Sequence, residues 1–288
     1  MLECVPNVSE GRDALVIEAL AASIVAAGAR LLDVHRDPDH HRSVFTFIGD
    51  APAVESAALA LARVAVRRID LRQHAGVHPR LGVLDVVPFV PLAGSSMPEA
   101  VDLAHEVGHA IAMELAVPVF FYAEAAVVAS RRELPVLRTG GLTALAQRLG
   151  DPAWRPDAGP SIVHPSAGVA VVGARRVLIA FNAVLDTSDI RIAEELARGL
   201  RESSGGLAAV RAIGVALASR GRAQVAMNLL DYRRTPPHAV AARLERDAAR
   251  LGVDVTEYEL VGCAPADAFS VLPGRPVVGL DPSRMLDF

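Results

Sequence analysis

The sequence predicts an α+β protein that contains two similar subdomains. Apolar and amphipathic segments follow in the order strand, helix, strand, strand, helix, strand over residues 2–90, and the same order recurs over residues 177–261. Between them, residues 130–168 are rich in proline and glycine, which is typical of a connecting region. We therefore expect two ferredoxin-like (βαββαβ) subdomains, residues 1–174 and 175–288, with the N-terminal one enlarged. Two such subdomains facing each other would leave a ligand cleft between them.

The first subdomain is predicted from short apolar runs and from helix boundaries. Asp50 and Pro52 suit the N-cap and the first turn of a helix, and Gly28 suits the end of the preceding one. The apolar run 83–90 has the pattern of a buried strand. The expected strands are residues 2–6, 30–35, 43–48, 83–90 and 118–122, with a turn at 7–11, and the expected helices are residues 13–27, the one that Asp50 opens, and 98–115.

The second subdomain repeats this order after a short helix predicted at residues 142–149. Residues 187–188 suit the start of one helix, and residues 235–236 suit the start of another. The helix at 98–115 has no counterpart here, which is why we expect the first subdomain to be the larger. The expected strands are residues 177–182, 210–217, 224–229 and 253–261.

The composition of the chain argues against several classes of protein. Of the 288 residues, 52% are hydrophobic and 22% are charged, which suits a compact fold with a large core. A net charge of -4 argues against a general nucleic-acid binder. Cys4 and Cys263 are the only cysteines, so neither a disulfide framework nor a zinc ribbon is encoded. Residues 2–13 lack an apolar leader, and the alanine-rich run 57–66 is too short to span a bilayer, so we expect a cytoplasmic protein without membrane contact.

A polar loop, residues 72–82, interrupts the helices and strands and holds two histidines, two arginines and two glycines. Histidine suits proton transfer near neutral pH because its ordinary pKa lies close by. His78 precedes a proline, which favours an extended backbone and a fixed ring direction, so His78 is the candidate catalytic residue. The alternative is that His74 is a surface residue and that the arginines pair with Asp70 and Asp85.

A second polar cluster lies in residues 33–42. Asp37, His40 and His41 could bind a metal in a metal-dependent hydrolase, but these groups come from one turn and have no known metal-site spacing. A solvated turn at a strand end is the alternative that we favour, so no metal is expected. Arg42, at the start of the next strand, could hold a ligand carboxylate through its forked donors.

Two glycine-bearing segments, residues 157–168 and 205–214, lack the GxGxxG spacing of a dinucleotide motif. Taken alone they are turns, and His164 in the first of them is expected to be structural. Asn182 and Asn228 end predicted strands, where an amide either closes a turn or hydrogen-bonds a polar ring.

The motifs of the chain up to about Gly262 resemble those of the glutamate formiminotransferase family, which includes the formiminotransferase domain of formiminotransferase-cyclodeaminase. The matching segments include Glu3–Asn7, Ser9–Gly11, Ile69–Arg72, His78–Arg80, Asp85 with Pro88 and Phe89, Trp154–Asp157, Gly173–Arg175, Leu178–Asn182, Ala212–Gly214, Ala223–Val225, and Asn228 with Leu229. Each segment alone is a weak match, whereas their combination is specific.

The resemblance implies an activity. A member of this family transfers the formimino group of N-formimino-L-glutamate to tetrahydrofolate, which gives 5-formiminotetrahydrofolate and L-glutamate in histidine degradation. Tetrahydrofolate would be a co-substrate bound between the two subdomains, and the protein would be a homodimer. Because the fused cyclodeaminase of the animal enzyme is not part of this chain, ammonia release would need a separate cyclodeaminase.

The resemblance also implies site residues. The catalytic histidine falls on His78, which would act as a proton shuttle. The folate-binding residues would be Gly159, Pro160, Ser161, Ile162, Val163, His164, Pro165, Ser166, Ala167 and Gly168, together with Gly205, Gly206, Leu207, Ala208, Ala209, Val210, Arg211, Ala212, Ile213 and Gly214. The residues that could bind substrate are Arg42, Arg80, Asn182 and Asn228, with the arginines suited to the glutamate carboxylates.

The chain departs from the family pattern at several positions. Val77 stands where Glu is usual, Ala123 where Gly is usual, Val184 and His41 where Asn is usual, and Ala226 where Ser is usual. A relative that uses another formimino or formyl donor, or another amine acceptor, is therefore the alternative. Paired subdomains of this kind also serve as sensing modules, so a non-catalytic protein that binds folate or another small molecule is a further alternative.

Overall fold

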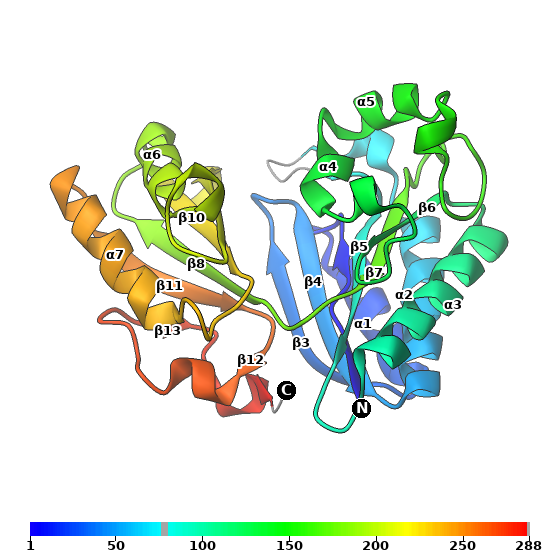
Figure 1. Ribbon diagram of the computed structural model, residues 1–288, viewed down its shortest axis with the longest axis horizontal. Coiled ribbons are helices and arrows are strands. Elements are labelled where there is room, and N and C mark those ends of the chain that lie inside the picture. The colour runs from blue at the N-terminus through cyan, green and yellow to red at the C-terminus, as the bar shows by residue number, and fades with distance from the viewer. Residues whose placement is uncertain (76–79, 287–288) are drawn as a thin grey trace. The chain divides into compact units, whose positions relative to one another are not determined.

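The chain folds into two compact units, residues 1–176 and 177–288 (Figure 1). The computed structural model describes residues 1–75 and 80–286. Each unit contains a mainly antiparallel sheet with helices, so the predicted α+β class and the predicted two-subdomain organisation are confirmed. The predicted ligand cleft between the subdomains stays a prediction.

The first unit is built on a seven-stranded sheet. Its strands are β1 (Leu2–Cys4), β2 (Asn7–Val8), β3 (Arg30–Asp37), β4 (Arg42–Gly49), β5 (Leu84–Pro91), β6 (Val119–Ala123) and β7 (Ala170–Ala174). From edge to edge the order is β3, β4, the β1–β2 pair, β5, β7 and β6. The strands from β3 to β5 are antiparallel, whereas β7 lies parallel between β5 and β6.

Two features of this sheet differ from the sequence expectation. Residues 7–8 continue the first strand instead of forming a turn, because the chain resumes pairing with β4 and β5 after Pro6, which has no N–H to donate. The strand β7 was not predicted. It is fully buried between two neighbours and therefore lacks the alternation of apolar and polar residues that marks a half-buried strand.

Three long helices cover one face of this sheet (Figure 1). They are α1 (Ala14–Ala26), α2 (Ala51–Arg68) and α3 (Met97–Leu115). Asp13 and Asp50 cap the first two, and Ser96 forms a capping box with Glu99 at the third. Their apolar stripes pack against alternate residues of β1, β4, β5, β6 and β7, which forms the largest core of the protein.

A helical insertion covers part of the opposite face. It contains α4 (Leu134–Arg138) and α5 (Gly141–Arg148), flanked by the 3-10 turns η2 (Ala129–Arg131) and η3 (Pro152–Trp154). Leu137 and Leu145 pack on Phe120 and Val171 of the sheet. Only α5 was predicted. Proline is typical of a connecting region, but Pro135 lies in the first turn of α4, where proline is tolerated.

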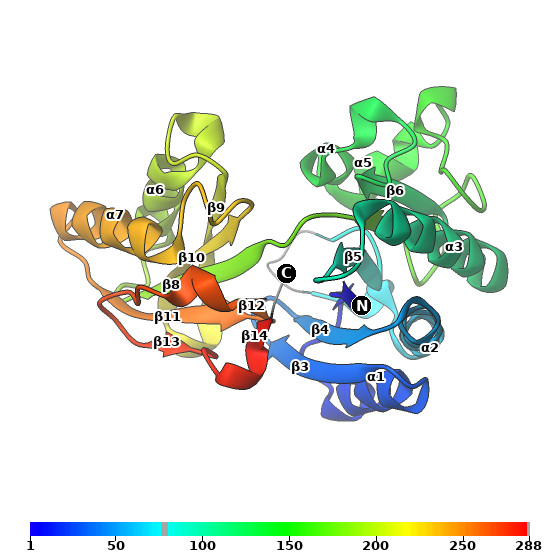
Figure 2. The same cartoon turned by 60° about the horizontal axis from the view of Figure 1, so that its bottom comes forward.

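The second unit repeats the βαββαβ order. Its sheet contains β8 (Ile179–Leu185), β9 (Val210–Leu217), β10 (Arg222–Leu229), β11 (Val255–Val261) and β13 (Val277–Val278), in the order β13, β11, β8, β10, β9. The helices α6 (Ile190–Leu200) and α7 (Pro237–Arg250) cover one face (Figure 2). The N-cap of α6 is Asp189 instead of the predicted residues 187–188. As in the first unit, the first strand of the repeat lies between the third and the fourth.

The last residues add small elements to the second unit. These are β12 (Ala264–Pro265), the turn η6 (Ala266–Phe269), β13, and β14 (Met285–Leu286), which pairs with β12. Phe269 packs edge-on against Phe181 of β8, so the tail completes the core. In the part of the chain that the structure describes, none of the helices combines the length and apolar character that crossing a membrane requires.

Candidate active site

The loop predicted to carry the catalytic residue lies against the first predicted folate-binding segment. Leu71 N donates to Ser166 O at 2.9 Å, Val83 N donates to Ala167 O at 2.9 Å, and Val169 N donates to Leu81 O at 3.0 Å. Gly82 and Gly168 form an antiparallel bridge at the centre of this contact. Two segments more than 80 residues apart in sequence are therefore joined by backbone hydrogen bonds on both sides of the bridge.

Residues 159–168, predicted to bind folate, form a loop that hydrogen bonds hold in place. His164 pairs with Gly168 through two backbone bonds of 3.0 Å, and its ring Nδ1 accepts from Ser166 N and Ala167 N at 3.3 and 3.0 Å. A ring nitrogen that accepts two N–H groups is unprotonated, so this imidazole holds the turn together. His78, the predicted catalytic residue, lies outside the described residues, as does Val77.

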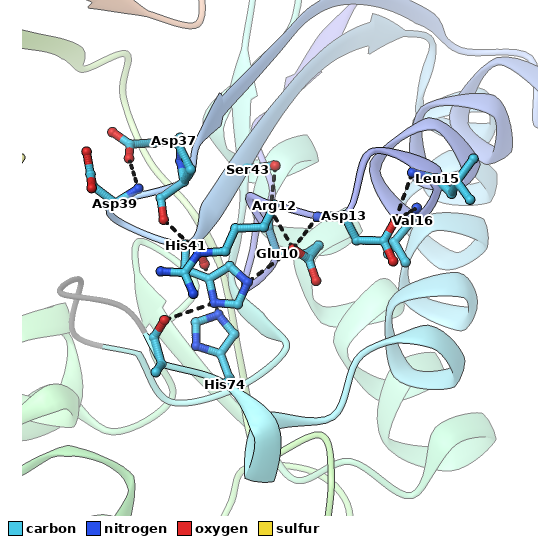
Figure 3. A network of polar contacts seen from close by, with 12 residues as sticks. Glu10, Arg12, Asp13, Leu15, Val16, Asp37, Asp39, His41, Ser43 and His74 are labelled. Atoms are coloured by element: carbon cyan, nitrogen blue, oxygen red, sulfur yellow. Dashed lines mark hydrogen bonds and ion pairs between the residues drawn. The ribbon is translucent and has the colours of Figure 1, made fainter. Parts of the chain in front are cut away.

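His41 links the segment around Glu10 to the loop 72–82 (Figure 3). Its Nε2 lies 3.1 Å from Glu10 Oε1, and its Nδ1 lies 3.1 Å from the carbonyl oxygen of Ala75. Both partners are acceptors, so a neutral ring donates to one of them and only a protonated ring donates to both. Burial lowers the pKa of His41, an effect that the Glu10 carboxylate opposes.

His74 stacks on His41, with ring centroids 3.8 Å apart and planes at 25°. Its Nε2–H donates to the carbonyl oxygen of His41 at 2.9 Å, and Arg80 donates to its Nδ1. Burial, together with the positive charges of Arg80 and His41, lowers the pKa of His74 to about 4. The alternative of a surface loop residue is therefore wrong: His74 is a half-buried neutral imidazole with both nitrogens engaged.

A cationic cluster surrounds Asp85 at the start of β5. This carboxylate is 1% exposed, accepts from Leu81 N at 2.9 Å, and pairs with Arg138 of α4. Burial lowers the pKa of Arg42 to about 10 and also lowers that of Arg80, whereas Asp85 raises both. Asp37 also raises the pKa of Arg42. Three guanidinium groups gathered near the Asp85 carboxylate form a cationic cluster of the kind that can hold an anionic ligand.

The pairing of Asp85 differs in part from the sequence expectation. Arg72 does pair with Asp70, at 2.6 Å, but this pair is largely exposed. The partner of Asp85 is Arg138, which sequence analysis missed because it lies in the helix that was predicted as part of a connecting region. No local spacing links residues 53 positions apart.

Sequence analysis also missed Glu3 as a functional candidate. It lies in the middle of β1, is 3% exposed, and faces away from α1–α3, because its neighbours Leu2 and Cys4 belong to the core under those helices. Burial raises the pKa of Glu3 to about 7, an effect that Arg175 opposes. A carboxyl group that titrates near neutrality is suited to proton transfer.

The metal-site alternative does not match the geometry. Asp37 Oδ1 accepts from the backbone N–H groups of Asp39 and His40 at 2.8 Å, so this carboxylate closes the turn between β3 and β4. The His41 ring points to Glu10 and Ala75 instead. Across residues 1–75 and 80–286, no group of three or more His, Cys, Asp or Glu side chains is placed to hold a metal ion.

In the second unit, the segment 205–214 has glycines at points of close approach. A Cβ on Gly206 would lie 2.4 Å from Leu200 O, and one on Gly214 would lie 2.5 Å from Glu194 N, so both glycines let α6 approach. Ala209 has a left-handed backbone with φ of 57°, and its N–H donates to Glu202 Oε2 at 3.0 Å. The segment is therefore a shaped turn followed by the first half of β9.

Asn182 and Asn228 lie on the face of the second sheet opposite α6 and α7, which we call the outer face. Residues of this face alternate along the strands with the core residues that face the helices, and they include Asn182, Val184, Gln224, Ala226, Asn228 and Glu259. Asn182 is in the middle of β8 instead of at a strand end, because β8 begins at Ile179 and continues to Leu185. Its Nδ2 donates to Glu259 Oε2 at 3.3 Å.

Comparison with protein families gives matches over both units. The N-terminal subdomain of the formiminotransferase domain matches residues 1–175, and the formiminotransferase domain matches residues 180–272. The chain belongs to the formiminotransferase family. The family resemblance and the transferase class expected from the sequence are therefore confirmed.

Relatives named as formimidoyltransferases align over most of the chain. A glutamate formimidoyltransferase of Streptococcus pyogenes is 40% identical over 269 residues, 93% of this chain and 90% of the relative. A glutamate formimidoyltransferase of Thermoplasma acidophilum is 39% identical over 271 residues, 93% and 89% of the two chains. The formimidoyltransferase-cyclodeaminase of Rattus norvegicus is 44% identical over 275 residues, but the match covers only 51% of its length.

The departures from the family pattern fall into two structural groups. His41 and Ala123 have left-handed backbones, with φ of 50° and 54°, where Asn and Gly are the easiest residues to accommodate. Val184 and Ala226 both lie on the outer face of the second sheet, beside Asn182 and Gln224. Compared with the usual family residues, His41 and Ala123 increase the strain of a left-handed backbone. Val184 and Ala226 remove side-chain hydrogen-bonding groups from the outer face.

Proposed function

We propose that this formiminotransferase moves the formimino group of N-formimino-L-glutamate to tetrahydrofolate, giving 5-formiminotetrahydrofolate and L-glutamate, as in histidine degradation. The names of the relatives, at about 40% identity over 93% of the chain, support this reaction. The observation that carries the proposal is the bridge between Gly82 and Gly168. It joins the loop that contains His78 to the first expected folate-binding segment, so one rigid support serves both.

In the proposed reaction, His78 acts as the proton shuttle. The folate nitrogen attacks the formimino carbon, and a new C–N bond forms as the C=N bond opens to a tetrahedral centre. His78 takes the proton from the attacking nitrogen and gives it to the nitrogen of glutamate. The C–N bond to glutamate then breaks as the C=N bond of the formimino group re-forms. One imidazole serves both transfers because its ordinary pKa lies near neutrality.

The proposed binding residues come from several segments of the chain. Residues 159–168 and 205–214 would hold the folate, with Asn182 and Asn228 as further contacts. Arg42 and Arg80 would hold the carboxylates of formiminoglutamate, and the gathering of these two arginines with Arg138 around Asp85 supports this role. No metal enters this mechanism.

The remaining expectations belong to the same proposal. The part of the rat relative beyond the match would correspond to a separate cyclodeaminase in this system. A cytoplasmic homodimer is expected, and the burial of both cysteines is compatible with a reducing compartment. Light scattering of the purified chain measures its mass and tests the homodimer.

The direct test is turnover. Purified protein is mixed with tetrahydrofolate and formiminoglutamate, and product is followed by absorbance and by mass. We expect turnover in the wild type and a loss of about 10²–10⁴-fold in His78→Ala, with an unchanged unfolding curve. His109→Ala, at an exposed site on α3, is the control. Equal turnover in His78→Ala and wild type would reject the mechanism.

A second candidate is transfer from another formimino donor, which the changes at Val184 and Ala226 favour. Formimino derivatives of other amino acids, supplied in the same assay, test it. A higher kcat/KM with one of these donors than with formiminoglutamate would replace the first assignment. Binding of tetrahydrofolate without turnover of any donor would instead identify a sensing module.

A further inference from the structure

The outer face of the second sheet holds a polar cluster in which Gln224 and Glu259 have no role in the proposal above. Gln224 of β10, Asn182 of β8 and Glu259 of β11 come from three adjacent strands. The helices α6 and α7 lie on the other face, so these side chains are not part of the core beneath them (Figure 2). Polar groups on neighbouring strands can present several hydrogen-bonding atoms to one planar ligand.

Hydrogen bonds fix the orientation of both amides. Gln224 Nε2 donates to Glu259 Oε2 at 3.4 Å, and Asn182 Nδ2 donates to the same oxygen at 3.3 Å. Asn182 Oδ1 accepts from Met227 N at 3.3 Å, so that amide uses both of its ends. Gln224 cannot turn its amide over without losing the bond to the carboxylate, which holds its Oε1 in place.

The Oε1 of Gln224 is left without a donor. The residue is 1% exposed, and this oxygen is buried with no hydrogen-bond partner among the described residues. The residues paired with Gln224 on the two neighbouring strands are Val184 and Val215, whose side chains have no N–H or O–H. A buried acceptor that lacks a partner is rare in native proteins, because burial removes its water without replacement.

We propose that Gln224 Oε1 and the Glu259 carboxylate form an acceptor pair that binds the amino-pyrimidinone edge of the folate pteridine ring. That edge carries the 2-amino group and the N3–H side by side, so it offers two donors in one plane to two acceptors on one sheet face. This assignment rests on the proposed function, since it takes tetrahydrofolate as the co-substrate. It adds a contact outside the segments 159–168 and 205–214.

The formimino group of the other substrate also has an N–C–N edge with N–H donors. Removal of the Gln224 acceptor distinguishes the two ligands, because only the ligand that binds there should lose affinity. Pteridine binding predicts a weaker Kd for tetrahydrofolate with little change in the KM for formiminoglutamate. Donor binding predicts the reverse.

The test uses one substitution in the full chain. Gln224→Met keeps the approximate size of the side chain but removes the acceptor. We expect it to weaken tetrahydrofolate binding, measured by calorimetry, by about tenfold or more. Thr256→Val, which removes a hydroxyl that donates to Val184 O at 3.1 Å, is the control and should bind as the wild type does.

A ligand change on the wild type avoids any question of folding. A 2-desamino analogue of tetrahydrofolate should bind the wild type about tenfold more weakly than tetrahydrofolate, and should bind Gln224→Met with no further loss. Equal binding of tetrahydrofolate to folded Gln224→Met and wild type, with turnover retained, would overturn this inference and leave the proposed function intact. A wild type that binds no tetrahydrofolate would overturn both.

Discussion

Gly82 and Gly168 approach each other so closely that neither tolerates a side chain. A Cβ on Gly82 would lie 1.9 Å from Val169 O, and a Cβ on Gly168 would lie 2.3 Å from Leu81 O. The obstructing atoms are backbone carbonyl oxygens that already accept or flank hydrogen bonds, so they cannot move aside cheaply. The two glycines are therefore the reason that the His78 loop and the loop 159–168 share one support.

The first prediction concerns this contact. Gly82→Ala should lower the free energy of unfolding by at least about 2 kcal/mol, because the new methyl group forces the bridge apart. Gly199→Ala makes the same chemical change on α6 with nothing within 4 Å, and should raise stability by about 1 kcal/mol. Urea unfolding measures both. Similar values for the two variants would contradict the close approach.

The second prediction concerns the pH dependence that His74 contributes. Its folded pKa of about 4 lies below the value of 6.5 for a free histidine, so the unfolded chain takes up the proton first as pH falls. The contribution of His74 to the free energy of unfolding is fully present above pH 6.5 and is lost as pH falls toward about 4. Because the ring is only half-buried, solvent screening reduces the effect to roughly 1 kcal/mol.

The measurement compares unfolding free energies at pH 7 and pH 4.5 in His74→Gln and in wild type. The variant should lose less stability than the wild type over this range. His109→Gln, at an exposed site on α3, is the matched control and should follow the wild type. If His74→Gln lost as much unfolding free energy between pH 7 and pH 4.5 as the wild type does, the pH dependence would come from other groups.

Much of the fold could be predicted because local sequence signals, such as helix caps and apolar runs, agree with the tertiary structure. Asp50 does cap α2, and β9 spans the predicted residues 210–217. The missed strand β7 shows where periodicity fails, since a strand buried on both faces has no alternation to detect. The helix α4 escapes sequence prediction because a proline-rich stretch is typical of a connecting region, although Pro135 lies in the first turn of the helix.

The site could be predicted less completely than the fold. Local sequence identified a loop rich in His and Arg, but the stacking of His74 on His41 joins residues 33 positions apart and depends on the pairing of β3 with β4. The buried acceptor of Gln224 depends on which side chains the neighbouring strands place beside it. Such relationships follow from strand register, which single-sequence patterns do not define.

The third prediction concerns Glu3. A carboxyl group whose folded pKa is about 7, against 4.5 when exposed, favours folding in its protonated form. Its contribution is present below pH 4.5 and is lost as pH rises toward 7, a difference of up to about 3 kcal/mol. Glu3→Gln mimics the protonated group, so it should be more stable than wild type at pH 8 and close to it at pH 4.5.

Urea unfolding at the two pH values measures this effect, with Glu18→Gln on the exposed side of α1 as the control. The control should follow the wild type at both values. If Glu3→Gln were less stable than wild type at pH 8, the carboxylate would be contributing a favourable interaction in the folded protein. The buried group would then be charged at that pH, contrary to the raised pKa.

The fourth prediction compares two Arg–carboxylate pairs in the first unit. Asp85 and Arg138 form a pair with side-chain exposures of 1% and 21%, whereas Glu124 and Arg132 form a pair with exposures of 41% and 48%. A double-mutant cycle with Asp85→Asn and Arg138→Met should give a coupling of about 2 kcal/mol, because the remaining charge is left in a poorly solvated site. The cycle with Glu124→Gln and Arg132→Met should give less than about 1 kcal/mol.

The same variants separate stability from substrate binding. Arg138→Met removes one of the three cations around Asp85, so the KM for a donor with carboxylates should rise while kcat changes less. Arg132→Met should leave the KM unchanged, since its partner is the exposed Glu124. Equal coupling in the two cycles would mean that burial adds nothing to the Asp85 pair. A KM that stays constant in Arg138→Met would remove this cation from the proposed binding site for the donor carboxylates.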